Sequence, residues 1–186
     1  KPAESKNDCI VFHGQRVDSG QITRPQPDRQ SSFPTMPFSL PPLPTTEDWS
    51  EFLSSVAGDF DCITATLHRL DPAYQQLKIV AYQGIPPQIM PMIQSIPVGK
   101  GIAGAAAERR APVELCNLQT DTSGVAKPDA KQTQVQGSLA VPVMDGDRLC
   151  GTLGIGKIVP YDFSEAEQAK LMGIAADVAA RLLPAV

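Results

Sequence analysis

The sequence lacks the features that mark a membrane-spanning protein or a metalloprotein. A membrane-spanning helix needs roughly 18 or more consecutive apolar residues, and the chain has no such run. Cysteine occurs four times, never as a C-x-x-C pair: Cys9, Cys62, Cys116 and Cys150. His13 and His68 are the only histidines, so neither a zinc site of the usual spacing nor a multi-histidine site is expected. These absences predict no membrane partner, no metal and no cofactor.

Positive charge is also sparse. The formal net charge is −4, and the basic residues are scattered, with Arg109 and Arg110 as the one tight pair. A nucleic-acid surface needs a basic stripe that offsets the phosphate charge, so no nucleic-acid partner is expected. Isolated cysteines are typical of buried thiols in a reducing compartment, which predicts a cytoplasmic location. The sequence starts at Lys1 rather than Met, which leaves a removed targeting segment open.

Composition divides the chain into two parts. Residues 1–45 hold eight of the eighteen prolines, and proline supports neither a helix interior nor a central strand. We expect an extended or disordered tail here; the alternative is a strap laid across the domain by Phe33, Phe38 and Leu40. Residues 46–186 are patterned throughout and are expected to form one domain.

The first half of that domain reads as a helix, a hairpin and short helices. Thr45 can cap a helix that Gly58 ends, and its apolar face has the helical period: Trp49, Phe52, Leu53 and Val56. "FDCITATLHRL" alternates as a strand, with Ala65 and Leu67 on one face and Thr64, Thr66 and His68 on the other. "LKIVAYQG" returns as its hairpin partner. Short helices are predicted near 88–93 and over "IAGAAAERR".

The second half reads as a strand, a loop, a hairpin and a long helix. "PVELCNL" is a predicted strand, and residues 119–136 form a long polar loop of the kind that is usually functional or mobile. Asp145-Gly146 predicts a second hairpin. Ser164 and Glu167 match a capping box, and the helix that follows to Leu183 has its own apolar face: Leu171, Ile174, Ala175, Val178 and Leu182. This order predicts an α+β fold with a central antiparallel sheet.

The stretch "IPVGKGIAGAAAERR" contains a G-x-G-x-x-G spacing at Gly99, Gly101 and Gly104. A dinucleotide site needs a parallel strand before these glycines and a full crossover helix after them. Prolines interrupt the preceding segment, the helix is about two turns long, and the later strands form a hairpin. The glycines are better explained by positive φ angles and by close packing of the helix.

Several motifs together resemble a GAF domain over residues 47–184. These are the glycine turn and its helix, Pro112-Val113, Ser138 before "VPV", the Gly151/Gly154 hairpin, and Phe163-Ser164 before the last helix. The resemblance implies a six-element sheet with helices on both faces and a small-molecule pocket on one of them. It also implies a homodimer interface on the terminal helices, here residues 46–57 and 164–183.

The resemblance leaves two functions open. One is a small-molecule sensor without an output domain of its own, which acts through dimerisation or a partner. The other is a thiol-dependent redox enzyme similar to the free methionine-(R)-sulfoxide reductases. Their nucleophilic cysteine lies in the loop before the Val-Pro strand, where this chain has none, and Ser138 stands near the acid position. The first function is favoured, and no catalytic residue is assigned.

Candidate ligand contacts follow from these expectations. Thr66 and His68 share one strand face, so either they line a wet pocket or His68 emerges at the strand end. Cys116 borders the polar loop and is either a core thiol or a redox or ligand contact. The loop's hydrogen-bonding groups and Lys100 suit a small polar or anionic ligand. The full set of candidates is Thr66, His68, Tyr82, Lys100, Cys116, Asn117, Gln119, Asp121, Thr122, Lys127 and Ser138.

Overall fold

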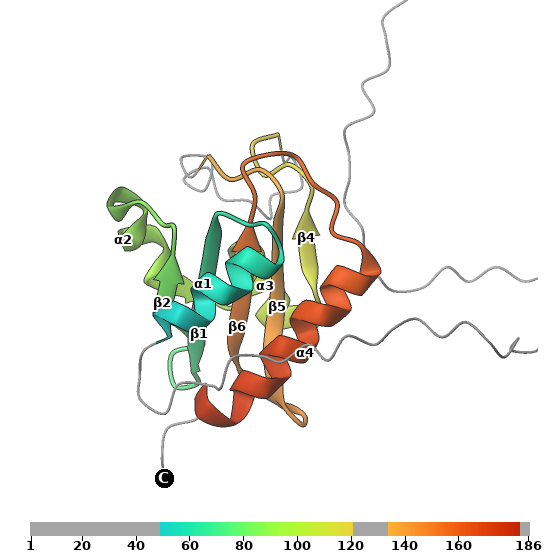
Figure 1. The fold of residues 1–186 in the computed structure, drawn as a ribbon. Helices are drawn as coiled ribbons and strands as arrows, with labels where there is room; N and C mark the ends of the chain where they lie inside the picture. The colour runs from blue at the N-terminus through green and yellow to red at the C-terminus, as the bar shows by residue number, and fades with distance from the viewer. Residues whose placement is uncertain (1–48, 121–133, 183–186) are drawn as a thin grey trace, which may run out of the picture.

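The computed structural model describes residues 49–120 and 134–182 (Figure 1). The elements, in chain order, are α1 (Ser50–Asp59), β1 (Thr64–Asp71), β2 (Gln76–Gln83), a 3-10 turn η1 (Pro87–Ile89), α2 (Met90–Ile93), β3 (Ser95–Pro97), α3 (Gly101–Arg109), β4 (Val113–Leu115), β5 (Ser138–Asp145), β6 (Arg148–Gly156) and α4 (Glu165–Leu182). The six strands form one sheet in the order β3-β2-β1-β6-β5-β4, and every neighbouring pair is antiparallel. The predicted α+β class is confirmed.

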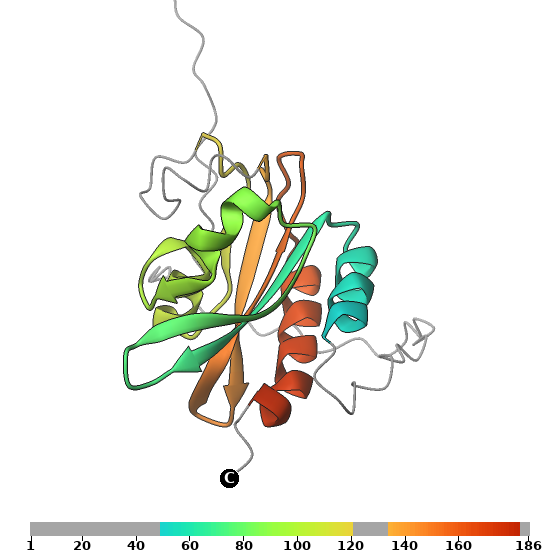
Figure 2. The same cartoon turned by 90° about the vertical axis from the view of Figure 1, so that its left-hand side faces the viewer.

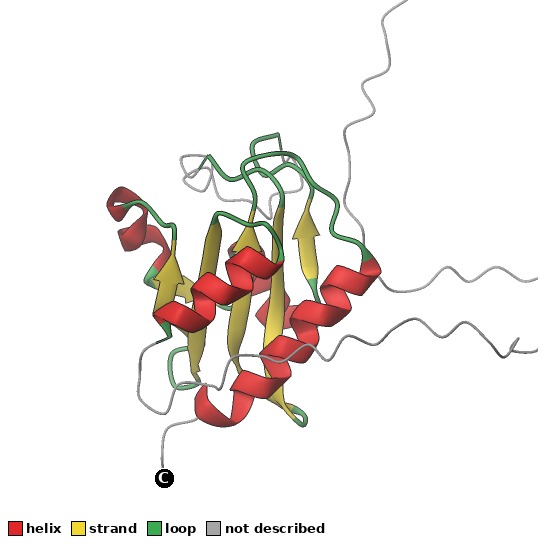
Figure 3. Ribbon diagram, in the orientation of Figure 1, coloured by secondary structure: helices red, strands yellow, loops and turns green. Residues whose placement is uncertain are grey.

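The sheet carries helices on both sides, as expected. Figure 2 shows α1 and α4 on one side and α2 and α3 on the other, and Figure 3 gives the same elements by type. We call the side under α1 and α4 the core face, and the side under α2 and α3 the cavity face. The two expected hairpins are present as β1–β2 and β5–β6, the latter turning at Gly146, where φ is +57°.

The core face holds a large buried apolar cluster. Alternate residues of β1, β5 and β6 meet the apolar faces of α1 and α4 in one buried cluster, which includes Leu53, Leu67, Val141, Leu153 and Leu171. The predicted α1 face is confirmed, since Trp49, Phe52, Leu53 and Val56 are all buried. The α4 face is confirmed likewise, by five buried residues: Leu171, Ile174, Ala175, Val178 and Leu182. Most of the buried apolar surface, and hence most of the hydrophobic stabilisation, lies on this face.

Polar contacts lock the start of α4 against the core face. Ser164 Oγ and Glu167 form the capping box, with the Ser164 amide donating to Glu167 Oε2 at 2.8 Å. Buried Glu114, on β4, accepts from the Phe163 amide and, at 3.0 Å, from Gln168 Nε2. The carboxylate therefore satisfies donors that the turn into α4 would otherwise leave buried without a partner.

The glycine turn has the role that its residues suggested. Gly99 has a φ of +81°, and a Cβ at Gly104 would lie 2.4 Å from the carbonyl oxygen of Pro97. Gly104 therefore lets α3 sit directly against the turn that leads into it.

The strand predicted over "PVELCNL" is shorter than expected, because its pairing with β5 ends at Leu115. The proline-rich segment contains a strand that the pattern did not reveal, the three-residue β3 at the sheet edge.

No helix in residues 49–120 and 134–182 is both long and apolar enough to cross a membrane. Within the same ranges, no three histidine, cysteine or acidic side chains are grouped so that they could hold a metal ion.

Candidate functional site

The cavity face encloses a cavity of about 490 Å³ between the sheet, the segment 89–96 and the start of α3. Its floor is formed by alternate residues of three strands: Thr64, Thr66, His68, Ser138, Ala140 and Gly154. Its cover is largely aliphatic: Ile89, Pro91, Met92, Ile93, Ile96, Ile102, Ala103, Leu118 and Val135. A volume of this size, with an apolar wall and a few polar groups, is typical of small-molecule sites.

The floor is hollow because the strands place small residues there. Gly154 stands across from Thr66 in the β1–β6 register, and Gly156 stands across from Thr64. Ala140 is the neighbour of Gly154 on β5. The opposite face of the same strands carries leucine, isoleucine and valine. Because side chains alternate along a strand, the same chain segment fills one face and leaves room on the other.

His68 is the one ionisable side chain among the described residues that line the cavity. Its side chain is 2% exposed, and Nε2 lies 2.9 Å from the carbonyl oxygen of Ile93. Burial lowers the pKa of His68 to about 4, against a smaller opposing effect of the Ile93 carbonyl, so the ring is neutral near pH 7. Nδ1 is buried and has no hydrogen-bond partner within residues 49–120 and 134–182.

Thr152 faces His68 directly across the β1–β6 pair. Residues directly opposite in an antiparallel pair point to the same face of the sheet, so the Thr152 side chain lies beside the imidazole. Its Oγ1 is also buried without a partner in the described part of the chain. Unpaired buried polar atoms of this kind are uncommon, and here two lie next to each other on the cavity face.

The structure brings together three of the candidate residues at the cavity: Thr66, His68 and Ser138. His68 lies on the cavity floor and does not emerge at the strand end. Tyr82 pairs with Thr66 across β1–β2 but is 45% exposed and lies outside the lining. Lys100 is exposed at the start of α3 and does not line the cavity either.

Two candidates that follow β4, Asn117 and Gln119, support residues of the cavity wall. Asn117 Oδ1 accepts from the Gln119 amide at 3.0 Å, and Gln119 Nε2 donates to the Val135 carbonyl at 2.7 Å. These contacts hold Leu118 and Val135 in place as cavity wall. Cys116 is half-buried and is not among the lining residues. Asp121, Thr122 and Lys127 lie outside the described residues.

Sequence reasoning missed the cover of the cavity. Ile89, Ile93 and Ile96 come from a proline-rich segment that seemed too irregular for long regular elements. The signal that could have found them is their spacing of four and three residues, which places them on one side of a helical turn. Thr152 was missed too, since a lone threonine in an apolar strand carries no local signal.

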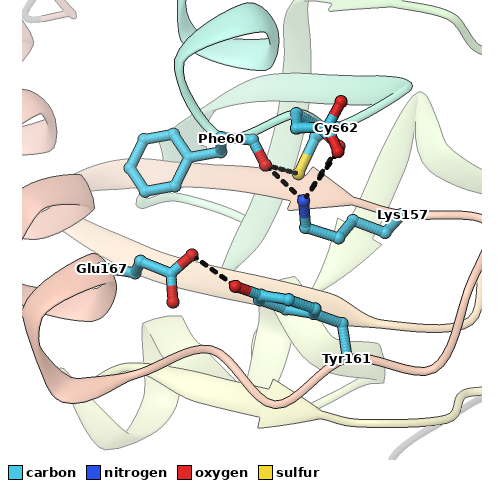
Figure 4. A network of polar contacts seen from close by, with 6 residues as sticks. Phe60, Cys62, Lys157, Tyr161 and Glu167 are labelled. Atoms are coloured by element: carbon cyan, nitrogen blue, oxygen red, sulfur yellow. Dashed lines mark hydrogen bonds and ion pairs between the residues drawn. The ribbon is translucent and has the colours of Figure 1, made fainter.

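A second polar group lies beyond the cavity, where β6 leads toward α4 (Figure 4). Lys157 is buried and donates from Nζ to the carbonyl oxygens of Phe60 and Asp61, at the C-terminal end of α1. The same Nζ lies 4.6 Å from the centre of the Tyr161 ring. Tyr161 in turn donates from its hydroxyl to Glu167, in the first turn of α4, at 2.9 Å. One lysine thus connects the end of β6 with both core-face helices.

None of the thiols of the described residues lines the cavity. Cys150 is buried in the core-face cluster, and Cys62 packs against that cluster. Burial raises the pKa of the Cys62 thiol to about 11, with nearby Lys157 opposing the shift, and burial also raises the pKa of Cys150. Both are therefore neutral near pH 7, which makes them poor nucleophiles.

The model of the family described as GAF domain matches residues 46–182 of the chain. No curated protein sequence matches it. Among solved structures, the chain is similar to the GAF domain of a phosphoenolpyruvate-protein phosphotransferase from Acinetobacter, with 23% identity, coverage of 70% of this chain and 77% of that one, and a TM-score of 0.59.

Two solved enzymes share the fold as well. One is the type II free methionine-R-sulfoxide reductase of Thermoplasma acidophilum, with 18% identity, coverage of 71% and 87%, and a TM-score of 0.58. The other is the free methionine-R-sulfoxide reductase of Neisseria meningitidis in complex with its substrate, with 17% identity, coverage of 74% and 80%, and a TM-score of 0.60. At these identities the likeness is one of fold.

Proposed function

The chain belongs to the GAF domain family, and from that premise we propose that it is a sensory domain that binds one small molecule in the cavity between the sheet and the segment formed by α2 and α3. The observation that carries the proposal is the cavity of about 490 Å³, which has a mainly apolar wall and is lined by buried His68, one of whose ring nitrogens has no hydrogen-bond partner in residues 49–120 and 134–182. Such a convergence of space, apolar surface and a few polar groups is the usual form of a ligand site.

The fold offers a route from the cavity to the core-face helices. β6 contributes Gly154 and Ile155 to the cavity lining, and Lys157 follows them by two residues. Lys157 holds the end of α1 and contacts Tyr161, which holds Glu167 of α4. A ligand that changes the position of β6 would therefore act on both helices through rigid contacts. We propose that this route passes the signal to a partner or to a homodimer formed by residues 46–57 and 164–183.

The competing function is a thiol-dependent reductase like the solved enzymes. In the described part of the chain no cysteine lines the cavity, which supports binding over thiol chemistry at that position. A coupled assay for reduction of free methionine sulfoxide, run on the wild type and Cys116→Ser, separates the two functions. Robust turnover that is lost in the variant would contradict the binding function.

The direct test of binding combines native mass spectrometry with a thermal-shift screen of purines, amino acids, small anions and neutral aromatic compounds. Ala103→Phe is the blocking variant, because Ala103 lines the cavity from α3. Ala169→Phe, on the exposed side of α4, is the matched control. We expect at least one stabilising or co-purifying compound whose effect Ala103→Phe abolishes and Ala169→Phe retains. The proposal would be overturned if no such compound were found, or if its effect persisted in both variants.

The signal route has its own test. A stabilising compound should shift the backbone amide resonances at the end of α1 and the start of α4 in the wild type. Lys157→Met keeps the length of the side chain and removes the ammonium donor, so binding should persist while those shifts shrink. Equal shifts in the variant would contradict the route through Lys157.

A further inference from the structure

The chemistry of the cavity floor restricts which small molecules can bind, given the proposed binding function on which this inference rests. The described lining carries no aspartate, glutamate, lysine or arginine, and His68 is its one ionisable group. Four hydroxyl side chains supply the other polar groups: Thr64, Thr66, Ser95 and Ser138. A fully charged ligand would lose its hydration here without an opposite charge to replace it, so its binding is disfavoured.

The hydrogen bond to Ile93 determines which nitrogen of His68 carries the proton. A backbone carbonyl oxygen can only accept, so Nε2, at 2.9 Å from it, must be the donor. In a neutral ring the other nitrogen is then an unprotonated acceptor. Nδ1 is therefore a buried lone pair without a donor in the described part of the chain.

An unmade hydrogen bond at a buried acceptor is costly, and the cost is recovered when a partner arrives. Thr152, directly across the strand pair, does not supply this partner, because its own Oγ1 also has no partner among the described residues. Ser95, the polar side chain of the cover, already donates to Gln76 Oε1 at 2.9 Å. Nδ1 is itself covered in this structure, so a molecule that enters the cavity supplies the missing donor once the imidazole shifts toward the space that His68 lines.

From this geometry we infer that the cavity selects an uncharged, mostly apolar ligand that carries one N–H or O–H group and donates it to Nδ1 of His68. An N–H of a neutral heteroaromatic ring or a phenol-type O–H has this chemistry. A carboxylate or phosphate has neither the donor nor a countercharge in the described lining. The expected ligand therefore differs from the polar or anionic one that the sequence suggested.

A pair of probes of nearly identical shape tests the donor requirement. Indole has a ring N–H, whereas benzofuran has an oxygen in its place and no donor. Benzoate and protonated benzylamine are the anionic and cationic probes. In titrations followed by NMR we expect indole to bind about five- to tenfold more tightly than benzofuran, from the usual net worth of one hydrogen bond. Both ions should bind more weakly than indole.

Two variants of His68 test which residue is responsible. His68→Leu removes the acceptor, so the preference for indole over benzofuran should vanish. His68→Gln retains an amide that can donate to the Ile93 carbonyl and an oxygen that can accept, so part of the preference should return. If the preference persists unchanged in His68→Leu, the assignment to His68 is wrong.

The tautomer can be read in the wild type, independently of any variant's folding. With ¹⁵N-labelled histidine the chain has two imidazoles, and His13→Gln identifies the signals of the other one. We expect a directly bonded proton on Nε2 of His68, none on Nδ1, and a change in the Nδ1 resonance when indole is added. A proton on Nδ1 would overturn the inference.

The outcomes separate this inference from the binding function. Two results would overturn the ligand class but support the binding function, provided that Ala103→Phe abolishes binding. One is equal binding of indole and benzofuran, and the other is tightest binding of benzoate or of a co-purified anion. Binding of no probe from any class, together with no co-purified compound, would overturn the binding function itself. Preferential binding of indole that Ala103→Phe and His68→Leu each abolish would support both.

Discussion

Along β1, successive residues face two different environments. Ala65 and Leu67 enter the packed cluster under α1 and α4, whereas Thr64, Thr66 and His68 border the cavity. The core face meets long amphipathic helices and carries branched aliphatic residues. The cavity face meets a short α3 and a proline-rich segment, and its strands carry glycine, alanine and threonine. The comparison indicates that the core face supplies most of the stability and that the cavity face has the space that the proposed ligand needs.

The largest expected effect comes from a cavity cut into the packed face. Leu171 on α4 is fully buried in the core-face cluster, so Leu171→Ala should lower the free energy of unfolding by about 3 to 4 kcal/mol. Ile102→Ala, on the half-buried cavity wall, should cost only about 1 kcal/mol, because the space beside it is already open. Urea denaturation measures both, and equal costs would contradict the division between the faces.

The next effect is a pH dependence of the free energy of unfolding that arises from His68 on the cavity face. His68 is held neutral with a pKa of about 4 in the folded chain, whereas a histidine in the unfolded chain has a pKa near its ordinary value of 6.5. Between these values the unfolded state binds more protons, so stability falls as the pH drops from about 6.5 to 4. The full loss is roughly 3 kcal/mol. His68→Gln does not titrate, and an identical pH profile for it and the wild type would refute this account.

A third effect tests a polar contact on the core face. Glu114→Ala leaves the buried amide of Phe163 without its acceptor and removes a partner of Gln168, which should cost about 2 kcal/mol. Asp147→Asn, in the exposed β5–β6 turn, is a control expected to change stability by less than about 0.5 kcal/mol. Thermal and urea denaturation provide the readout. A cost for Glu114→Ala as small as that of the control would show that the carboxylate does not hold the start of α4.

The smallest expected change in stability comes from enlarging a side chain that points into the cavity. Ala103→Phe extends into open space, so it should change the free energy of unfolding by less than about 1 kcal/mol, in contrast with overpacking a filled core. A similar insertion on the core face, Ala175→Phe, should cost more, about 1 to 3 kcal/mol, because Ala175 is fully buried. Equal costs would indicate that the cavity face is as tightly packed as the core face.

These differences also explain what the sequence revealed. The core face was predictable because amphipathic helices and alternating strands repeat with fixed periods, and the apolar positions of α1, β1 and α4 follow those periods. The capping box at Ser164 and Glu167 and the turn at Gly146 were predictable because local backbone geometry demands particular residue types. The role of the glycines in the turn at 99–104 was predictable for the same reason, since positive φ angles and close packing demand glycine.

The cavity was only partly predictable. Thr66, His68 and Ser138 could be named because polar residues on an inner strand face are unusual. The wall formed by Ile89, Ile93 and Ile96 was not named, because their helical spacing lies in a proline-rich segment and does not reveal their long-range contacts with the sheet. The unpaired state of Nδ1 depends on the distance between His68 and Ile93, 25 residues apart, which no local pattern encodes.

Methyl-resolved NMR of isoleucine-labelled protein during titration with indole tests the central claim most directly, because isoleucines lie in the cavity, in the core and on the surface. Four belong to the cover of the cavity, Ile89, Ile93, Ile96 and Ile102, and Ile155 contributes to both the cavity lining and the core-face cluster. Ile174 lies in the core-face cluster, and Ile63 and Ile158 are 44% and 51% exposed. We predict saturable shifts at the cavity methyls and none at Ile174. Shifts confined to Ile63 and Ile158, or no shifts with indole or with any compound from the thermal-shift screen, would contradict a ligand site on the cavity face.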